Sequence, residues 1–214
     1  DYLQEGWDMV QRNIAKISSL AMDLLTFSKE RKPEYRLAQA NEVAAEVVEL
    51  MRKRAEEFGI NLSLETADDL QPVAMDVRGI HQCLVNLVSN AIDACQPEIC
   101  GHEQGRVTLS TCSHPNWAVC FEVKDNGCGI STEDKEKIFT TFFSTKGADG
   151  TGLGLLNVQK IAQEHGGSIE VESEPAKGSA FRLLLPSGPN EDGERVYEYS
   201  GGENENQESH SVVA

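Results

Sequence analysis

Hydrophobic residues recur every three or four positions along four stretches of the chain, which is the spacing of helices with one apolar face. These stretches are 1–31, 41–58, 76–95 and 153–164. Other short runs alternate hydrophobic and polar residues, as strands with one buried face do. The runs are 60–64, 106–112, 117–124, 168–173 and 180–185, with a shorter one at 72–75. The pattern predicts a chain that mixes helices with strands, in which 106–112 and 117–124 pair.

Residues with special backbone or capping preferences mark the ends of these elements. Asn41 and Asp76 precede hydrophobic stretches and are predicted to cap the N-termini of two helices. Gly59 suits a helix C-terminus, and Pro33 ends or bends the first helix. The sequence His165-Gly166-Gly167 is expected to end the last one.

Three segments lack a sustained pattern. Residues 97–105 hold proline and glycine and are predicted to form a loop. After a short predicted helix at 134–139, residues 140–151 are expected to be a mobile loop. Residues 187–214 carry seven acidic residues against one arginine, and we expect a disordered, solvated tail. A role for this tail in binding a partner stays open.

The first helix carries an apolar stripe that a lone helix cannot bury. Two interpretations remain open: a core helix of the same domain, or half of a helical hairpin. The exposed stripe also suggests self-association. The stripe consists of Val10, Ile14, Ile17, Leu20, Ala21, Leu24 and Leu25.

Composition limits the classes of function. The 214 residues carry a formal net charge of −16, which disfavours nucleic-acid binding because phosphate contacts need Lys and Arg. No apolar run approaches the roughly 18 residues of a membrane span, and no signal peptide is visible. The six cysteines form no C-x-x-C pair, so we expect reduced thiols in a cytosolic protein and no zinc site. Because the chain starts inside a predicted helix, we expect a fragment of a longer protein.

Two asparagines lie on the predicted helix over 76–95. Asn86 and Asn90 are four residues apart and therefore share one face of that helix. Their amides have the chemistry to complete the coordination of a magnesium ion that phosphates already hold. Two ordinary surface amides remain the alternative at this point.

The sequence Asp125-Asn126-Gly127-Cys128-Gly129-Ile130 follows a predicted strand. Its glycines permit a tight turn and the close approach of a ligand. A carboxylate at the end of the strand can accept a hydrogen bond from the amine of adenine, and Ile130 can form an apolar wall beside the base. An ordinary Asp-Asn-Gly turn is the competing interpretation.

The sequence Gly150-Thr151-Gly152-Leu153-Gly154-Leu155 opens the predicted helix over 153–164. Exposed amides and the helix dipole make such a start suitable for phosphate. Lys146 precedes it and has the charge to contact a terminal phosphate. A flexible loop with a solvated lysine is the alternative.

Together these runs resemble the nucleotide-binding boxes of sensor histidine kinases, which share a superfamily with heat-shock chaperone and mismatch-repair ATPases. Residues 86–94 resemble the asparagine box, and residues 139–146 the phenylalanine box. Residues 125–130 and 150–155 resemble the two glycine boxes. More loosely, Asp23-Leu24-Leu25-Thr26-Phe27-Ser28 resembles the second helix of the dimerisation and phosphotransfer hairpin.

The resemblance implies a two-layer α/β sandwich, with helices on one face of a mixed sheet. It implies three regions: a partial hairpin at 1–35, a catalytic ATP-binding domain at 36–186 and the tail at 187–214. ATP and magnesium are the implied ligands, with Asn90 on the metal, Asp125 on adenine and residues 140–151 as a lid. Asn86 and Lys146 are the implied catalytic residues. The other implied nucleotide contacts are Asp93, Gly127, Gly129, Ile130, Phe142, Thr145, Gly150, Thr151, Gly152, Leu153 and Gly154.

Two departures from relatives qualify this picture. The related ATPases carry a water-activating Glu where this chain has Asn86, which favours phosphoryl transfer over hydrolysis. Many histidine kinases have a basic residue where this chain has Asp93, which puts the phosphate contacts there in doubt.

The resemblance also implies partners outside the chain. It implies a homodimer in the full protein and a response-regulator receiver domain as partner. We expect a cytoplasmic domain, and membrane anchoring of the parent protein stays open. The family phosphorylates a histidine on the first hairpin helix that is followed by an acidic residue. Of the five histidines here, only His102 precedes an acidic residue, Glu103, and it lies in the predicted loop over 97–105, so we expect the phosphoacceptor upstream of Asp1. An ATPase of the same superfamily and a nucleotide-independent interaction module are the rival functions.

Overall fold

The computed structural model describes residues 6, 7, 9–11, 14, 33–100, 104–140, 143 and 151–187. The predicted helix over 1–31 and the predicted tail over 187–214 therefore lie almost entirely outside the described residues. The six described residues of the first segment are all helical, and among them Val10 and Ile14 are exposed.

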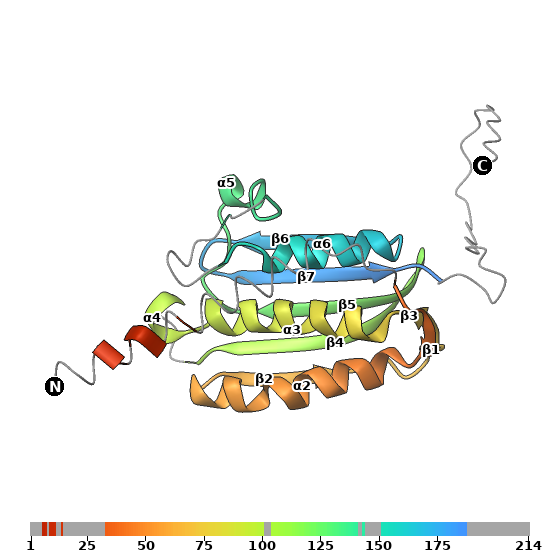
Figure 1. Ribbon diagram of the computed structural model, residues 1–214, viewed down its shortest axis with the longest axis horizontal. Helices are drawn as coiled ribbons and strands as arrows, with labels where there is room; N and C mark the ends of the chain where they lie inside the picture. Colours follow the sequence, from red (N-terminus) through yellow and green to blue (C-terminus); the bar gives the residue numbers. More distant parts are fainter. Residues whose placement is uncertain are drawn as a thin grey trace.

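One layer of the molecule is a five-stranded sheet in the order β2-β4-β5-β7-β6 (Figure 1). β2 runs parallel to β4, and the other neighbouring strands are antiparallel. The sheet is therefore mixed, as the resemblance implied. Its strands are β2 (Asn61–Glu65), β4 (Arg106–His114), β5 (Trp117–Asp125), β6 (Ser168–Glu174) and β7 (Gly178–Leu185).

Three helices form the second layer on one face of this sheet (Figure 1). Two shorter helices lie in the connections that flank the β4–β5 hairpin. The layer contains α2 (Ala40–Glu57), α3 (Val77–Ala94) and α6 (Gly154–Glu164), and the short helices are α4 (Pro97–Cys100) and α5 (Thr132–Lys135). The predicted two-layer α/β fold is confirmed. No helix in the described part of the chain is long and apolar enough to cross a membrane.

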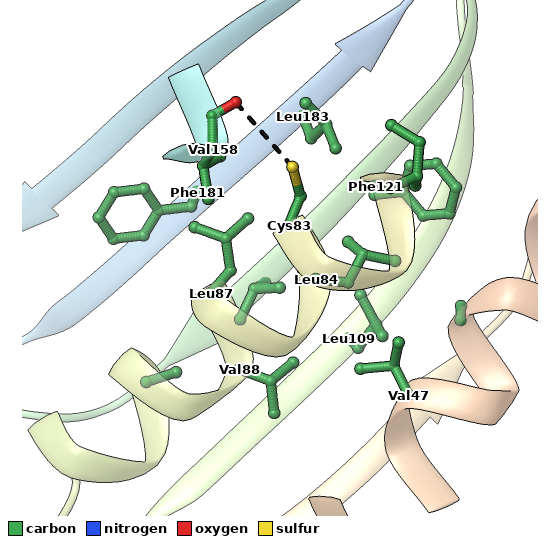
Figure 2. Close-up of a cluster of buried hydrophobic side chains, with 14 of the residues drawn as sticks. Val47, Cys83, Leu84, Leu87, Val88, Leu109, Phe121, Val158, Phe181 and Leu183 are labelled. Atoms are coloured by element: carbon green, nitrogen blue, oxygen red, sulfur yellow. Dashed lines mark hydrogen bonds between the residues drawn. The ribbon is translucent and has the colours of Figure 1, made fainter. Parts of the chain in front are cut away.

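Helix α3 occupies the centre of the core, between α2 and α6 (Figures 1 and 2). Its buried residues Leu84, Leu87 and Val88 face side chains of the sheet, while Val47 reaches the cluster from α2 (Figure 2). The thiol of Cys83 lies 4.0 Å from the carbonyl oxygen of Val158 in α6. Burying one face of α3 in this way leaves its opposite face, with the two asparagines, free to line a site.

Three of the predicted helix boundaries are formed by the residues and the backbone conformations that the sequence indicated. The Asp76 carboxylate accepts a hydrogen bond from the N–H of Gly79 at 3.3 Å and caps α3. Gly59 and Gly166 have φ angles of 66° and 67°, the left-handed conformation that ends α2 and α6.

The predicted cap at Asn41 is wrong. The helix begins at Ala40 after Gln39, and the Asn41 side chain bonds elsewhere. Its amide nitrogen donates to the Ala67 carbonyl, and its oxygen accepts from the Thr111 hydroxyl. A tertiary contact to β4 therefore takes the side chain that local capping would have used.

The structure also corrects three connections. β3 (Val73–Met75) exists as predicted, but it pairs with an unpredicted strand, β1 (Arg36–Ala38), outside the main sheet. The predicted loop over 97–105 contains α4. The helix predicted at 134–139 begins earlier, at Thr132, because Ser131 caps it, and it ends at Lys135.

Candidate nucleotide-binding site

Asp125 ends β5 with its carboxylate buried, at 6% exposure. Its Oδ1 accepts hydrogen bonds from the N–H groups of Gly127 at 2.8 Å and Ser179 at 3.2 Å. Within the described residues, no donor contacts Oδ2. This leaves one carboxylate oxygen for a ligand with an N–H donor, such as the amine of adenine.

Burial also changes the chemistry of this carboxylate. Desolvation raises the pKa of Asp125 from 3.8 to about 6, although the two backbone hydrogen bonds act in the opposite direction. The anion at neutral pH is therefore a poorly solvated acceptor. Such a group gains more from a new hydrogen-bond donor than an exposed carboxylate does.

The two glycines of the loop after Asp125 are required by the protein itself. A Cβ on Gly127 would overlap the carbonyl of Ala94, at the end of α3, and Gly129 has a φ of 67°. A Cβ on Gly129 would overlap the carbonyl of Glu174 in β6. The glycines therefore allow the loop to pack between α3 and β6. The sequence had suggested another reason for these glycines, the close approach of a ligand.

Ile130 is positioned by the same packing. Its N–H donates to the Ser173 hydroxyl at 2.8 Å, and that hydroxyl donates to the Gly178 carbonyl at 2.9 Å. The Ile130 side chain is half-buried against the core. Its position beside the Asp125 loop is consistent with the predicted apolar wall.

Asn86 and Asn90 lie on α3, and both are partly exposed. The Asn86 amide accepts from Gln82 at 3.3 Å and donates to the Gly154 carbonyl at 3.5 Å. The structure therefore brings the asparagine box against the start of α6, which belongs to the second glycine box. Two motifs that are 68 residues apart form one surface.

Asp93 shares this face of α3, one turn beyond Asn90, because residues at steps of three and four lie above one another. The Arg54 guanidinium of α2 lies 2.8 Å from its carboxylate, and Gln96 donates to the same oxygen at 3.4 Å. Arg54 also lies 5.9 Å from the centre of the Phe58 ring. The acidic residue of the box is thus paired with a cation from α2.

The N-terminus of α6 has no side-chain cap. The Thr151 hydroxyl accepts from the Leu153 N–H at 3.3 Å, and Gly152 has a φ of 66°. Leu153 is buried and anchors the turn, whereas the space around a Cβ on Gly154 is empty of described protein atoms to 4 Å. Uncapped amides at an open helix start fit phosphate oxygens.

Four predicted site residues lie outside the described residues: Phe142, Thr145, Lys146 and Gly150. Their roles stay predictions. In the described part of the chain, no group of three or more His, Cys, Asp or Glu side chains could hold a metal. Amide oxygens are ligands that magnesium accepts alongside phosphates, so the asparagines of α3 have chemistry that fits such an ion.

The sequence patterns missed several residues that build the site. Ser179 donates to Asp125, and a Cβ on Gly178 would overlap the Asp125 carbonyl. The sequence did offer one signal for these two residues, the predicted break between the last two strands. Gly178 lies in that break and adopts a φ of 96°. Arg54 carried no local signal, because only tertiary packing brings it beside Asp93.

Comparison with known proteins identifies the class. The family model described as "Histidine kinase-, DNA gyrase B-, and HSP90-like ATPase" matches residues 75–189. The match covers more than half of the chain, and the chain belongs to this family. Its nucleotide-binding domain is of the sensor histidine kinase type, as the resemblance implied.

Individual proteins that resemble this chain are also histidine kinases or structural matches to them. The signal transduction histidine-protein kinase AtoS of Escherichia coli (strain K12) is 32% identical over 186 residues, which cover 87% of this chain and 29% of that protein. Full-length ShkA in complex with AMPPNP matches with a TM-score of 0.74 at 26% identity, covering 86% of this chain and 39% of ShkA.

A third match includes a partner. The histidine kinase ThkA in complex with the response regulator protein TrrA matches with a TM-score of 0.71 at 30% identity, covering 87% of this chain and 52% of the matched one. The chain thus spans well under two thirds of the length of each of these three proteins.

Proposed function

We propose that this chain binds Mg-ATP and that the longer protein transfers the γ-phosphoryl group to a histidine outside this chain, and from there to an aspartate of a response regulator. The observation that carries the proposal is the buried Asp125 carboxylate, whose Oδ1 is held by two backbone N–H groups while Oδ2 is left for adenine. The family membership and the AMPPNP complex of ShkA support ATP as the nucleotide.

Each part of the site has a distinct role in this proposal. Asp125 and Ile130 bind the base, and Asn90 completes the coordination of magnesium. The start of α6, with Gly152 and Gly154, binds the phosphates, together with Lys146. Magnesium, when bound, would neutralise phosphate charge, and the uncapped N–H groups of α6 would orient the phosphate oxygens.

Asn86 favours transfer over hydrolysis. Its side chain is a neutral amide that accepts from Gln82 and donates to Gly154, and an amide cannot take a proton from water. The site therefore positions a nucleotide without supplying a general base from this helix position. A phosphoacceptor that arrives from outside would supply the nucleophile.

The described histidines do not offer that acceptor. His165 is buried. Its Nε2 accepts a hydrogen bond from the Asp76 N–H at 3.0 Å, and its Nδ1 lies 2.7 Å from the Ile161 carbonyl oxygen. Both ring nitrogens are thus engaged. His114 accepts from its neighbour Asn116 at the β4–β5 turn, and His81 lies on α3. His102 and His210 fall outside the described residues.

Partners follow from the same comparison. The complex of ThkA with TrrA supports a response-regulator receiver domain as the partner of the longer protein. Exposed Val10 and Ile14 on the first segment support a helical interface between two copies. The requirement for ATP supports a cytoplasmic location.

Calorimetry with AMPPNP and magnesium tests the nucleotide site. We expect binding to the wild-type chain, and binding to an Asp69→Asn control, because Asp69 lies exposed in the loop before β3. We expect the Asp125→Asn variant to bind at least about tenfold more weakly. No heat of binding with the folded wild-type chain would contradict the proposal, and so would equal affinity of the two variants.

Labelling with γ-labelled ATP tests the direction of transfer. We expect the chain alone to take up no acid-labile label, and turnover of ATP to stay near that of a buffer blank. A turnover well above the blank that is lost in an Asn90→Ala variant would identify an ATPase instead.

A further inference from the structure

Two cysteines face each other across the β4–β5 hairpin. Cys112 and Cys120 are directly opposed in the antiparallel register, and the Cys112 thiol donates to the Cys120 carbonyl at 3.6 Å. Their neighbours Thr111 and Phe121 are also paired, and Phe121 belongs to the core under the helices. Because side chains alternate along a strand, both thiols lie on the sheet face that points away from the helices.

Opposed residues of an antiparallel pair come close to the spacing that a disulfide requires. Their Cβ atoms lie about 4.5–5.5 Å apart, and a disulfide needs about 3.5–4.5 Å. The two Cβ atoms therefore need to move only a short distance toward each other. The register of the hairpin shifts between Cys112 and His114, so an irregularity next to Cys112 allows this end of β4 to adjust.

The two thiols differ in their access to solvent. Cys120 is buried at 1% exposure, and this burial, together with its hydrogen bond to the Cys112 thiol, raises its pKa to about 12. Cys112 is partly exposed. An oxidant from solvent therefore reaches Cys112 first, and Cys120 is held next to it as the second thiol.

We propose that Cys112 and Cys120 form a redox site, in which a low-molecular-weight disulfide such as oxidised glutathione converts the two thiols into a cross-strand disulfide. The Cys112 thiolate attacks one sulfur of the oxidant, forms a mixed disulfide and releases one glutathione thiolate. The Cys120 thiol then loses its proton and attacks the Cys112 sulfur, which releases the second glutathione. The chain loses two electrons and two protons, and the oxidant becomes two glutathione molecules.

Other cysteines of the described part are less suited to this chemistry. The Cys95 thiol is turned toward the Arg106 carbonyl and the Asn126 side chain, and burial raises its pKa to about 11. Cys100 donates to the backbone carbonyl of Cys95 rather than to its sulfur. Neither residue faces a thiol across a strand pair.

Incubation of the purified chain with a series of glutathione redox buffers, followed by alkylation and peptide mass mapping without reduction, tests the proposal. We expect a Cys112–Cys120 linked peptide in the wild-type chain that disappears after reduction. We expect the oxidised chain to melt about 5 °C higher, because the bond closes a loop within an intact hairpin.

Single variants define the order of the two steps. In a Cys120→Ser chain, we expect Cys112 to remain as a glutathione mixed disulfide, and in a Cys112→Ser chain we expect Cys120 to stay reduced. A Cys100→Ser control should oxidise like the wild type. The proposal is overturned if wild-type Cys112 stops at the mixed disulfide, or if Cys95–Cys100 is the linked pair instead.

Discussion

The two ends of the proposed nucleotide site are built in opposite ways. At the adenine end, Asp125 is buried and the glycines of the loop after it pack against Ala94 and Glu174. At the phosphate end, α6 starts without a side-chain cap, and the space around Gly154 is open. One end is enclosed by the protein, and the other leaves backbone donors for a ligand.

The neighbouring helix α3 starts differently from α6, although α2 also begins without a side-chain cap, after Gln39. Helix α3 begins beside the C-terminal end of α6, and its first turn is closed by Asp76. Both helices lie in the same layer, so a general lack of capping residues does not explain the difference. The first turn of α3 is closed by a side chain of the protein, whereas the first turn of α6 leaves backbone amides at the place where we propose that phosphates bind.

Gly129→Ala should have the largest effect, on folding. A φ of 67° and the overlap with the Glu174 carbonyl make any side chain unfavourable there, and we expect a loss of about 3 kcal/mol in the free energy of unfolding. Gly154→Ala is the matched control at the open end and should leave that free energy nearly unchanged. Urea denaturation measures both, and equal losses would remove the distinction between enclosed and open ends.

The pH dependence of stability should reveal the enclosed carboxylate. Because the pKa of Asp125 is raised from 3.8 to about 6, the folded state binds more protons than the unfolded state between these values. Stability contributed by this group is therefore lost as the pH rises from about 4 to 6, by about 3 kcal/mol at most. The difference in unfolding free energy between the wild type and Asp125→Asn, measured across this range, should follow that curve. A difference in unfolding free energy that stays constant with pH would contradict the burial of the charge.

Asp125→Asn should separate binding from stability. The variant lacks the anion that accepts the adenine amine, so AMPPNP affinity should fall about 10- to 100-fold at pH 7.5. The melting temperature of the unliganded chain should stay the same or rise, because a buried charge is removed. A fall in both the AMPPNP affinity and the melting temperature would indicate that Asp125 has only a structural role. In the wild type, affinity should weaken as the pH falls below about 6, opposite in sign to the change in stability.

Arg54→Gln should have the smallest effect and should act at the phosphate end. Loss of the ion pair removes the positive charge beside the Asp93 carboxylate on the face that carries Asn90, so we expect about twofold weaker binding of ATP and unchanged binding of AMP. Arg52→Gln removes the same charge from α2, but Arg52 pairs with Glu49 in its own helix. Titrations in low salt should distinguish the two variants, and identical affinities would place Arg54 outside the site.

Local signals in the sequence predicted much of the fold. Asp76 caps α3 and Gly59 ends α2, because each effect depends on residues within one turn. Asn41 has the same local preference as Asp76, and the prediction for it was wrong because its amide bonds to Ala67 and Thr111. β1 was missed for a related reason: a three-residue strand exists only through its pairing with β3.

The residues of the candidate site also fall into two groups, those that local signals predicted and those that they did not. The motifs at Asn86, Asp125 and Gly150 to Gly154 were recognisable in the sequence, since each is a short run of characteristic residues. The donor Ser179, the Arg54–Asp93 pair and the opposed thiols of Cys112 and Cys120 were not. These contacts join segments that no periodicity relates to one another.

The sequence by itself determined where most of the longer helices and strands lie, the order of the nucleotide-binding motifs and the class of chemistry they support. These properties depend on hydrogen bonds and hydrophobic spacing within a few residues. Only the tertiary structure decided which carboxylate is buried, which helix start stays open and which thiols meet. Burial and pairing depend on segments that are distant in the chain, because the packing of α3 between the sheet and its neighbouring helices brings them together.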